Sequence, residues 1–326
     1  MSFRLLGIGS PLIDRSARVP EEFLATVGGG KGGTRHVTGT ELAALLRKLP
    51  RAVHTVAGGA AANTMMAAAE LGLSSALLGK LGADEDGAFF RRSLLTSGAD
   101  DSELRTDPEA GTGCCLVLIT PDAERTMRSD LGASTRLTAE ETAQCDFSRY
   151  DWVLFEGYFV NAGYFEPTLR IAREAGARVA VDLCSCELAA RERERFTTLL
   201  ERYADLVFAN RDEAEARTGL SDPEAIASKI CGGRRTAAVK LGACGSLVAT
   251  PDGMTAVPPA PVKQAVDTTA AGDFYAAGFF YGLSKGLPPE KCGYAGSLTA
   301  AAIVQRTGTK LDREEWKQLK SKLENL

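Results

Sequence analysis

The chain has 326 residues and a net charge of -4, with 38 lysine and arginine residues against 42 aspartate and glutamate residues. Hydrophobic residues make up 44% and charged residues 25%, which is typical of a soluble globular protein. This balance argues against a nucleic-acid partner, which needs a basic surface. No apolar stretch is long enough to cross a bilayer, and Met1–Gly7 indicates a first strand rather than a signal peptide. No membrane partner is expected.

The cysteines and histidines disfavour metal chemistry. No two of the 8 cysteines have the Cys-x-x-Cys spacing of a zinc site. Most lie in apolar surroundings, as Cys184 does after Val181-Asp182-Leu183, which favours buried reduced thiols and a cytoplasmic location. Because His36 and His54 are the only histidines, a general base is expected to be a carboxylate.

The first half of the chain begins with a strand over Arg4–Gly9 that ends in a Gly-Ser-Pro turn. From about Asp14 to Thr55 the sequence is rich in glycine and shows no clean periodicity. The predicted elements that follow are a helix over 63–71, a strand over 76–81, a helix over 86–97 and two antiparallel strands over 114–120 and 125–129.

From Trp152 onward, short apolar strands alternate with amphipathic helices. The predicted series is strand 152–155, helix 165–175, strand 178–182, helix 187–203, strand 206–209, strand 236–241 between helical stretches, and closing helices over 273–285, 288–306 and 312–325. This alternation predicts crossover connections and a mostly parallel sheet. Ligands bind such sheets outside the carboxyl ends of the strands.

The domain organisation is simple, because the chain shows no internal repeat, linker or clear boundary. We expect one α/β domain over residues 1–326, with a small discontinuous lid formed by about 14–56 and 103–131. The strands of the lid could pair with another subunit or close over the same chain, so a monomer and a homodimer both stay open.

A loop of small residues, Asp267–Asp273, precedes an apolar helix near the C-terminal end. Small side chains let a ligand approach the backbone N–H groups, and a helix N-terminus favours an anion such as a phosphate. Asp273 has two interpretations. It is the N-terminal cap of the helix, where aspartate is favoured, or a general base beside a phosphate site.

Two further polar positions lie where helices are expected to begin. Asn63 follows the paired Gly58 and Gly59, which indicates either a ligand contact or a helix cap after a tight turn. Asn210 and Glu213 follow a strand, where they suit a water-held Mg²⁺ or a phosphate, or form an ordinary cap with a first-turn acid.

Two glycine-rich segments have different interpretations. Gly28–Thr34 has the wrong spacing for a P-loop, because Gly32 and Gly33 separate Lys31 from Thr34, so a flexible flap is expected. Lys240-x-Gly242-x-x-Gly245 ends a strand and indicates a hairpin turn or a seat for a nucleotide.

In this order the motifs resemble the ribokinase-like (PfkB) carbohydrate kinase family over nearly the whole chain. The shared elements are Asp14, Gly58-Gly59-x-x-x-Asn63, Gly79-Lys80-Leu81-Gly82-Ala83-Asp84, Asn210-x-x-Glu213, Lys240-x-Gly242-x-x-Gly245 and Asp267–Asp273. The resemblance implies a three-layer α/β/α fold with a mostly parallel central sheet and a small β lid. Lys31-Gly32, Arg125-Thr126-Met127 and Leu131-Gly132-Ala133-Ser134 look most like the adenosine-kinase-like branch.

The resemblance implies an ATP-dependent kinase that transfers the γ-phosphoryl group to the primary hydroxyl of a sugar or nucleoside. Asp273 is then the general base, and the backbone N–H groups of Ala270, Ala271, Gly272 and Asp273 stabilise the charge on the transferred group. The family usually has glycine where this chain has Ala270, and alanine disfavours a positive φ.

The nucleotide side of the site follows from the same resemblance. Asn210 and Glu213 are expected to organise Mg²⁺ and the ATP phosphates through water. Lys240, Gly242 and Gly245 are expected to lie along the nucleotide.

The acceptor side is expected to use Asp14, Gly59 and Asn63, which hold the ring hydroxyls while the lid closes to exclude water. In this family Asp267 and Thr269 also border a site for a monovalent cation such as K⁺.

The acceptor itself stays open between a sugar and a nucleoside. A nucleoside base needs an aromatic face, which Tyr158-Phe159 could supply, although Phe159 could equally belong to the core. A different class of function, a catalytically silent sugar- or nucleotide-binding regulator on the same fold, is disfavoured by the presence of Asp273, Asn210 and Glu213. No Gly-x-Gly-x-x-Gly follows the first strand, which argues against an NAD-dependent dehydrogenase.

Overall fold

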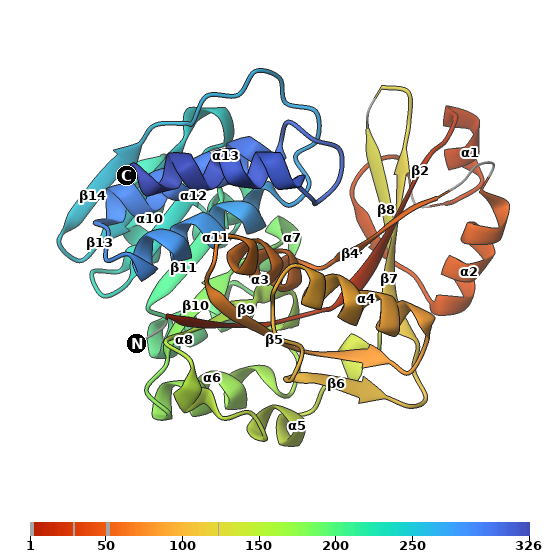
Figure 1. The fold of residues 1–326 in the computed structure, drawn as a ribbon, viewed down its shortest axis with the longest axis horizontal. Coiled ribbons are helices and arrows are strands. Elements are labelled where there is room, and N and C mark those ends of the chain that lie inside the picture. Colours follow the sequence, from red (N-terminus) through yellow and green to blue (C-terminus); the bar gives the residue numbers. More distant parts are fainter. Residues whose placement is uncertain (1–2, 29, 50–52, 123) are drawn as a thin grey trace.

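The computed structural model describes residues 3–28, 30–49, 53–122 and 124–326. Gly29 of the glycine-rich segment lies outside the described residues. A nine-stranded sheet forms the centre of the molecule, and a five-stranded sheet stands at the carboxyl end of its first strand (Figure 1).

The central sheet has the strand order β14-β13-β12-β11-β10-β9-β1-β5-β6. Every neighbouring pair from β12 to β6 is parallel, and β13 and β14 continue the sheet antiparallel at one edge. This confirms the mostly parallel sheet. The strands are β1 Arg4–Ile8, β5 Ser74–Gly82, β6 Leu104–Asp107, β9 Trp152–Glu156, β10 Arg178–Asp182, β11 Leu206–Asn210, β12 Thr236–Lys240, β13 Ser246–Thr250 and β14 Gly253–Val257.

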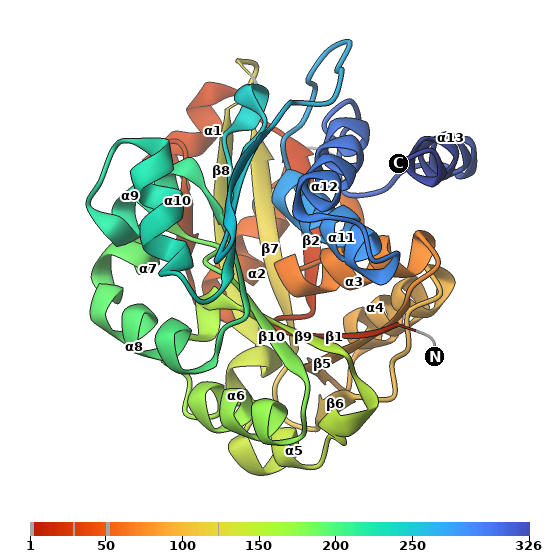
Figure 2. The same cartoon turned by 90° about the vertical axis from the view of Figure 1, so that its left-hand side faces the viewer.

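Helices cover both faces of this sheet and confirm the three layers (Figure 2). Each face buries its own apolar core, because parallel strands expose side chains on both sides. One face carries α3 Ala60–Glu70, α4 Glu85–Thr96, α11 Ala271–Ser284, α12 Pro289–Ile303 and α13 Arg313–Glu324. The other carries α5 Ala139–Ala143, α6 Phe165–Glu174, α7 Cys186–Arg191, α8 Arg193–Tyr203, α9 Arg211–Thr218 and α10 Pro223–Cys231.

The second sheet has the order β3-β8-β7-β2-β4 and a small core of its own under two helices. Its elements are β2 Leu12–Arg18, α1 Glu21–Ala25, β3 Thr34–His36, α2 Gly39–Lys48, β4 His54–Gly58, β7 Thr112–Ile119 and β8 Arg125–Gly132. The predicted antiparallel pairing of the strands near 114–120 and 125–129 is confirmed by β7 and β8.

Three expectations need correction. The segment from 103 does not begin the second sheet, because β6 pairs with β5 of the central sheet and only β7 and β8 join the smaller one. The irregular early segment contains helix α2, and the capping box of Thr38 and Glu41 was its overlooked signal. The helix expected over 187–203 is interrupted at Glu192, where no glycine or proline marks the break.

Short 3₁₀ helices connect several elements, at Ala133–Arg136, Phe147–Arg149, Gly157–Phe159 and Gly242–Cys244. Within the described ranges, no helix combines the length and the apolar character that crossing a membrane requires.

Candidate active site

Asp273 lies in the first turn of α11 and is not the helix cap. The helix begins two residues earlier than predicted, at Ala271, and the cap position belongs to Ala270. The Asp273 carboxylate instead accepts a hydrogen bond from Asn63 Nδ2 at 2.9 Å. Loss of hydration raises the pKa of Asp273 to about 8, although the Asn63 hydrogen bond opposes the shift. The interpretation as a simple cap is therefore wrong, and the carboxylate is available for other chemistry.

The backbone at the start of α11 offers unpaired donors. Ala271 N–H is bound by Thr268 O at 3.2 Å, and Phe274 N–H begins the regular helical pattern. Among the described residues, the N–H groups of Gly272 and Asp273 have no acceptor. Free N–H groups at a helix N-terminus bind anions. Of the four N–H groups predicted to bind phosphate, that of Ala271 is thus already occupied.

Asn63 connects α3 to this helix. It lies in the first turn of α3 after the cap residue Gly59, so it does not cap the helix. Its side chain is buried, and among the described residues its Oδ1 atom has no hydrogen-bond partner. A buried polar atom without a partner is rare and points to a missing donor. A ligand hydroxyl beside Asp273 would supply that donor.

Two glycines bring the second sheet against this site. A Cβ atom at Gly58 would lie 2.1 Å from Asp14 Oδ2, and one at Gly59 would lie 1.9 Å from the carbonyl oxygen of Ser10. Gly59 also has a φ of 104°, which side chains disfavour. Burial raises the pKa of Asp14 to about 7. The structure thus brings the predicted acceptor residues together: Asp14 lies on β2, Gly59 joins β4 to α3, and Asn63 lies in α3.

Phe159 does not join them. Its side chain is 6% exposed and packs in the core against Tyr164, with ring centroids 5.9 Å apart. The prediction of an aromatic face at Phe159 is therefore wrong, because the chain after β9 turns this ring into the sheet's hydrophobic layer. Its neighbour Tyr158 is 42% exposed.

Three charged residues end strands at the same edge of the sheet. Glu156 ends β9, where it accepts hydrogen bonds from the N–H and Oγ of Ser10 and from the N–H of Ala61. Burial raises its pKa to about 7. Asp182 ends β10 and pairs with Lys240 of β12 at 3.2 Å. Glu156 and Asp182 were missed from the sequence, although a charged residue closing an apolar strand was the available signal.

The predicted magnesium residues form a capping box on α9. Asn210 Oδ1 accepts from Glu213 N–H at 2.8 Å, and both Glu213 oxygens accept from Asn210, also at 2.8 Å. Burial raises the pKa of Glu213 to about 7. No described cluster of three or more histidines, cysteines or acids could hold a metal directly. The pair therefore suits only a Mg²⁺ that keeps its water ligands.

The segment after β12 is the predicted hairpin turn. Gly245 has a φ of 89°, and a Cβ atom there would lie 2.1 Å from Val257 O, so the turn itself requires glycine. Gly242 has a φ of 59°, and no heavy atom lies within 4 Å of where its Cβ would be. The backbone at Gly242 thus faces open space, and a nucleotide seat there stays a prediction.

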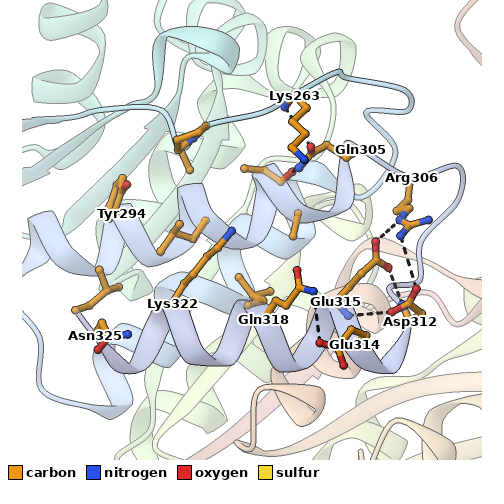
Figure 3. A pocket seen from close by; sticks show the side chains of 17 residues that line it. Lys263, Tyr294, Gln305, Arg306, Asp312, Glu314, Glu315, Gln318, Lys322 and Asn325 are labelled. Carbon is orange, nitrogen blue, oxygen red and sulfur yellow. Dashed lines mark hydrogen bonds and ion pairs between the residues drawn. The ribbon is translucent and has the colours of Figure 1, made fainter.

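A large groove elsewhere is not this site. It lies between α12 and α13, has a volume of about 920 Å³, and contains none of the predicted site residues (Figure 3). Among its charged side chains, Arg306 is paired with Asp312 and Glu315.

With this geometry in place, comparison with known proteins decides the family. Residues 39–316 match the pfkB family carbohydrate kinases. The chain belongs to this family. It is therefore a sugar or nucleoside kinase, which transfers a phosphoryl group to an alcohol.

Full-length relatives and structures agree. Adenosine kinase 2 of Arabidopsis thaliana is 28% identical over 93% of this chain and 94% of the relative. A probable sugar kinase from Rhizobium etli CFN 42 has a TM-score of 0.89 and 27% identity, and 99% of each chain is covered. Adenosine kinase from Sinorhizobium meliloti has a TM-score of 0.88 and 28% identity over 99% of this chain and 100% of that one.

The loop of this pfkB kinase is strained at Ala270, which has a φ of 60°. Of the described residues other than glycine, only Ala270 and Cys184 have a positive φ. Ala270 is the cap residue of the helix that carries Asp273, and Cys184 lines a small pocket together with Asp273. Such conformations concentrate at functional sites.

Replacing Ala270 by glycine is expected to raise the free energy of unfolding by about 0.5–1 kcal/mol, because relief of the left-handed strain exceeds the entropy that glycine loses on folding. Urea unfolding measures the change. Ala175→Gly is the matched control, because Ala175 has a φ of -75° and gains no relief. A loss of stability in the Ala270 variant, equal to that of the control, would contradict the strain.

An arginine side chain contacts Asp267 and Thr269, the two residues predicted to border a monovalent cation. Arg125 of β8 contacts Thr269 Oγ1 and Asp267 Oδ1, and the N–H of Gly308 binds Asp267 Oδ2 at 2.9 Å. Burial raises the pKa of Asp267, but these hydrogen bonds and the Arg125 charge hold it below its ordinary value. As placed, these side-chain oxygens do not fit a monovalent cation, and the guanidinium supplies the positive charge instead.

Proposed function

We propose that this kinase transfers the γ-phosphoryl group of ATP to the primary hydroxyl of a nucleoside or sugar, with adenosine as the first candidate. The observation that carries the proposal is the position of Asp273. Its carboxylate lies beside the unpaired N–H groups of α11 and beside Asn63, whose buried Oδ1 lacks a donor. A base, an anion site and a hydroxyl site therefore meet at one point.

In the proposed reaction, Asp273 takes the proton of the acceptor hydroxyl. The hydroxyl oxygen forms a bond to the γ-phosphorus, the bond from that phosphorus to the bridging oxygen breaks, and ADP leaves with the electron pair. The N–H groups of Gly272 and Asp273 stabilise the charge on the group in transit, helped by the helix dipole.

The acceptor is proposed to lie between the two sheets. Asn63 Oδ1 accepts from one hydroxyl, and Asp14 lies on the neighbouring strand β2, with its carboxylate against Gly58. The second sheet, acting as a lid, excludes water from the reacting atoms.

Mg²⁺ is proposed to bind through water near Asn210 and Glu213, whose own oxygens are committed to each other. When bound, the ion would neutralise charge on the ATP phosphates. Through their capping box, Asn210 and Glu213 fix the start of α9 at the edge of the sheet where the nucleotide is expected.

Two observations bear on the acceptor. Similarity to adenosine kinases over almost the whole chain favours a nucleoside. The burial of Phe159 leaves only Tyr158 of the two aromatic residues expected to face a base, and keeps a free sugar as the second candidate.

A thermal-shift screen with adenosine, other nucleosides, ribose, fructose and 2-keto-3-deoxygluconate separates the candidates, because a bound ligand stabilises the folded state by RT ln(1 + [L]/Kd). We expect adenosine to raise Tm and to support ADP formation from ATP. A rise in Tm with a free sugar and none with nucleosides would replace adenosine by that sugar as the proposed acceptor. No ADP formation with any member of the panel would favour the silent regulator.

A further inference from the structure

Lys240 is the last residue of β12, and its ammonium is held among acids. Nζ donates to Asp182 Oδ2 at 3.2 Å, and the Lys240 side chain is 14% exposed. Among the described residues, no second hydrogen-bond acceptor contacts Nζ. An ammonium has three N–H donors, so two of them are left for a ligand.

The free side of this ammonium faces the start of α11. A Cβ atom placed at Gly272 would lie 3.0 Å from Lys240 Nζ. Glycine at this position therefore lets the charge approach the same N–H groups that are proposed to bind the phosphoryl group. The contact joins strand β12 to helix α11 at the reacting end of the site.

Three acidic side chains surround the ammonium of Lys240. Asp182, Glu213 and Asp273 face it from β10, α9 and α11, and in their ionised forms they would repel a phosphate. Burial lowers the pKa of Lys240, but the attraction of these three acids outweighs it and holds the pKa above its ordinary value. The ammonium therefore stays charged at neutral pH.

We propose that Lys240 is a catalytic residue whose ammonium, held by Asp182, binds the phosphoryl group in transit above the N-terminus of α11. The proposal rests on the proposed kinase reaction and adds a side-chain cation to its backbone anion site. Lysine acts on phosphate as a point charge, and its attraction grows as negative charge gathers on the transferred group. Lys240 should therefore act mainly on kcat.

The competing role is purely structural. In that role Lys240 only neutralises Asp182, since removing one member of a buried ion pair leaves the other charge uncompensated. A double variant separates the two roles. Lys240→Met with Asp182→Asn removes both charges, and an asparagine there can still accept the hydrogen bond that Cys184 N–H donates to Asp182 Oδ1 at 3.1 Å.

The experiment uses the full chain, ATP and the acceptor found in the screen. We expect Lys240→Met to lower kcat about 10²-fold, to leave the Kd of the acceptor unchanged, and to lower Tm. The double variant should recover Tm but keep the low kcat. Lys240→Arg keeps the positive charge and should therefore have a higher kcat than Lys240→Met. Lys317→Met on the exposed side of α13 is the matched control and should behave as wild type.

Two outcomes would overturn the proposal. One is an unchanged kcat in Lys240→Met, and the other is recovery of wild-type kcat in the double variant, which would assign the lysine a structural role. Failure of the proposed function looks different, because the wild-type protein would then form no ADP with any acceptor.

Discussion

Replacing Asp273 by asparagine is expected to lower kcat about 10³-fold, because a general base contributes roughly 10²- to 10⁴-fold and asparagine cannot take the hydroxyl proton. The shape of the side chain is preserved, and its oxygen can still accept from Asn63 Nδ2. Binding of the acceptor and of ATP should therefore change little. Steady-state ADP formation and calorimetric titration of both ligands measure the two quantities separately.

The loss of kcat in the Asp273→Asn variant should not come from unfolding of the protein. The pKa of Asp273 is raised to about 8 in the folded protein, above the pKa of an aspartate in the unfolded chain. The folded state therefore loses stability as the pH rises from the unfolded pKa to about 8, because ionising the buried carboxyl is unfavourable. The neutral asparagine lacks this cost and should be at least as stable at pH 8.5. Asp252→Asn, in the exposed turn between β13 and β14, is the control. Wild-type turnover in the Asp273 variant would rule out the base.

Replacing Gly59 by alanine is expected to lower the free energy of unfolding by about 3 kcal/mol, from roughly 1–2 kcal/mol for the positive φ and 1–3 kcal/mol for the overlap. The added Cβ would lie 1.9 Å from the backbone oxygen of Ser10, which cannot rotate away. Relief requires the start of α3 to shift, and Asn63 would move away from Asp273. Activity should therefore fall with stability.

Gly72→Ala separates overlap from backbone strain. Gly72 also has a positive φ, 91°, but no heavy atom lies within 4 Å of its added Cβ. The control should cost only the conformational part, about 1–2 kcal/mol, and should leave kcat intact. Urea unfolding of both variants measures the difference. Equal losses at Gly59 and Gly72 would mean that the Ser10 contact is unimportant.

Local patterns predicted most of the elements. The strand over 178–182 has the predicted bounds, and those over 152–155, 206–209 and 236–241 differ by one residue at one end. These strands are short apolar runs bounded by polar residues, and such patterns depend only on neighbours in the chain. The break at Glu192 was missed because no local signal marks it.

The roles of individual side chains were harder to predict. Asn210 and Glu213 satisfy each other in a capping box, and Phe159 packs into the core. Local sequence allowed both a ligand and a structural interpretation of these residues, and the family resemblance favoured ligand binding by Asn210 and Glu213. Arg125 and Asp267 lie 142 residues apart, yet their contact fills the predicted cation position. Such outcomes depend on which charges and voids meet after folding.

The amino-acid sequence by itself determined the parallel α/β layers, the second sheet in outline and the Asp267–Asp273 loop, because hydrophobic period, glycine position and motif order are properties of the chain. Only the tertiary structure decided that Asp273 faces Asn63 rather than capping its helix, and that Lys240 lies between Asp182 and Gly272. These contacts join strands and helices distant in sequence, and their pairing depends on packing and burial that no local pattern encodes.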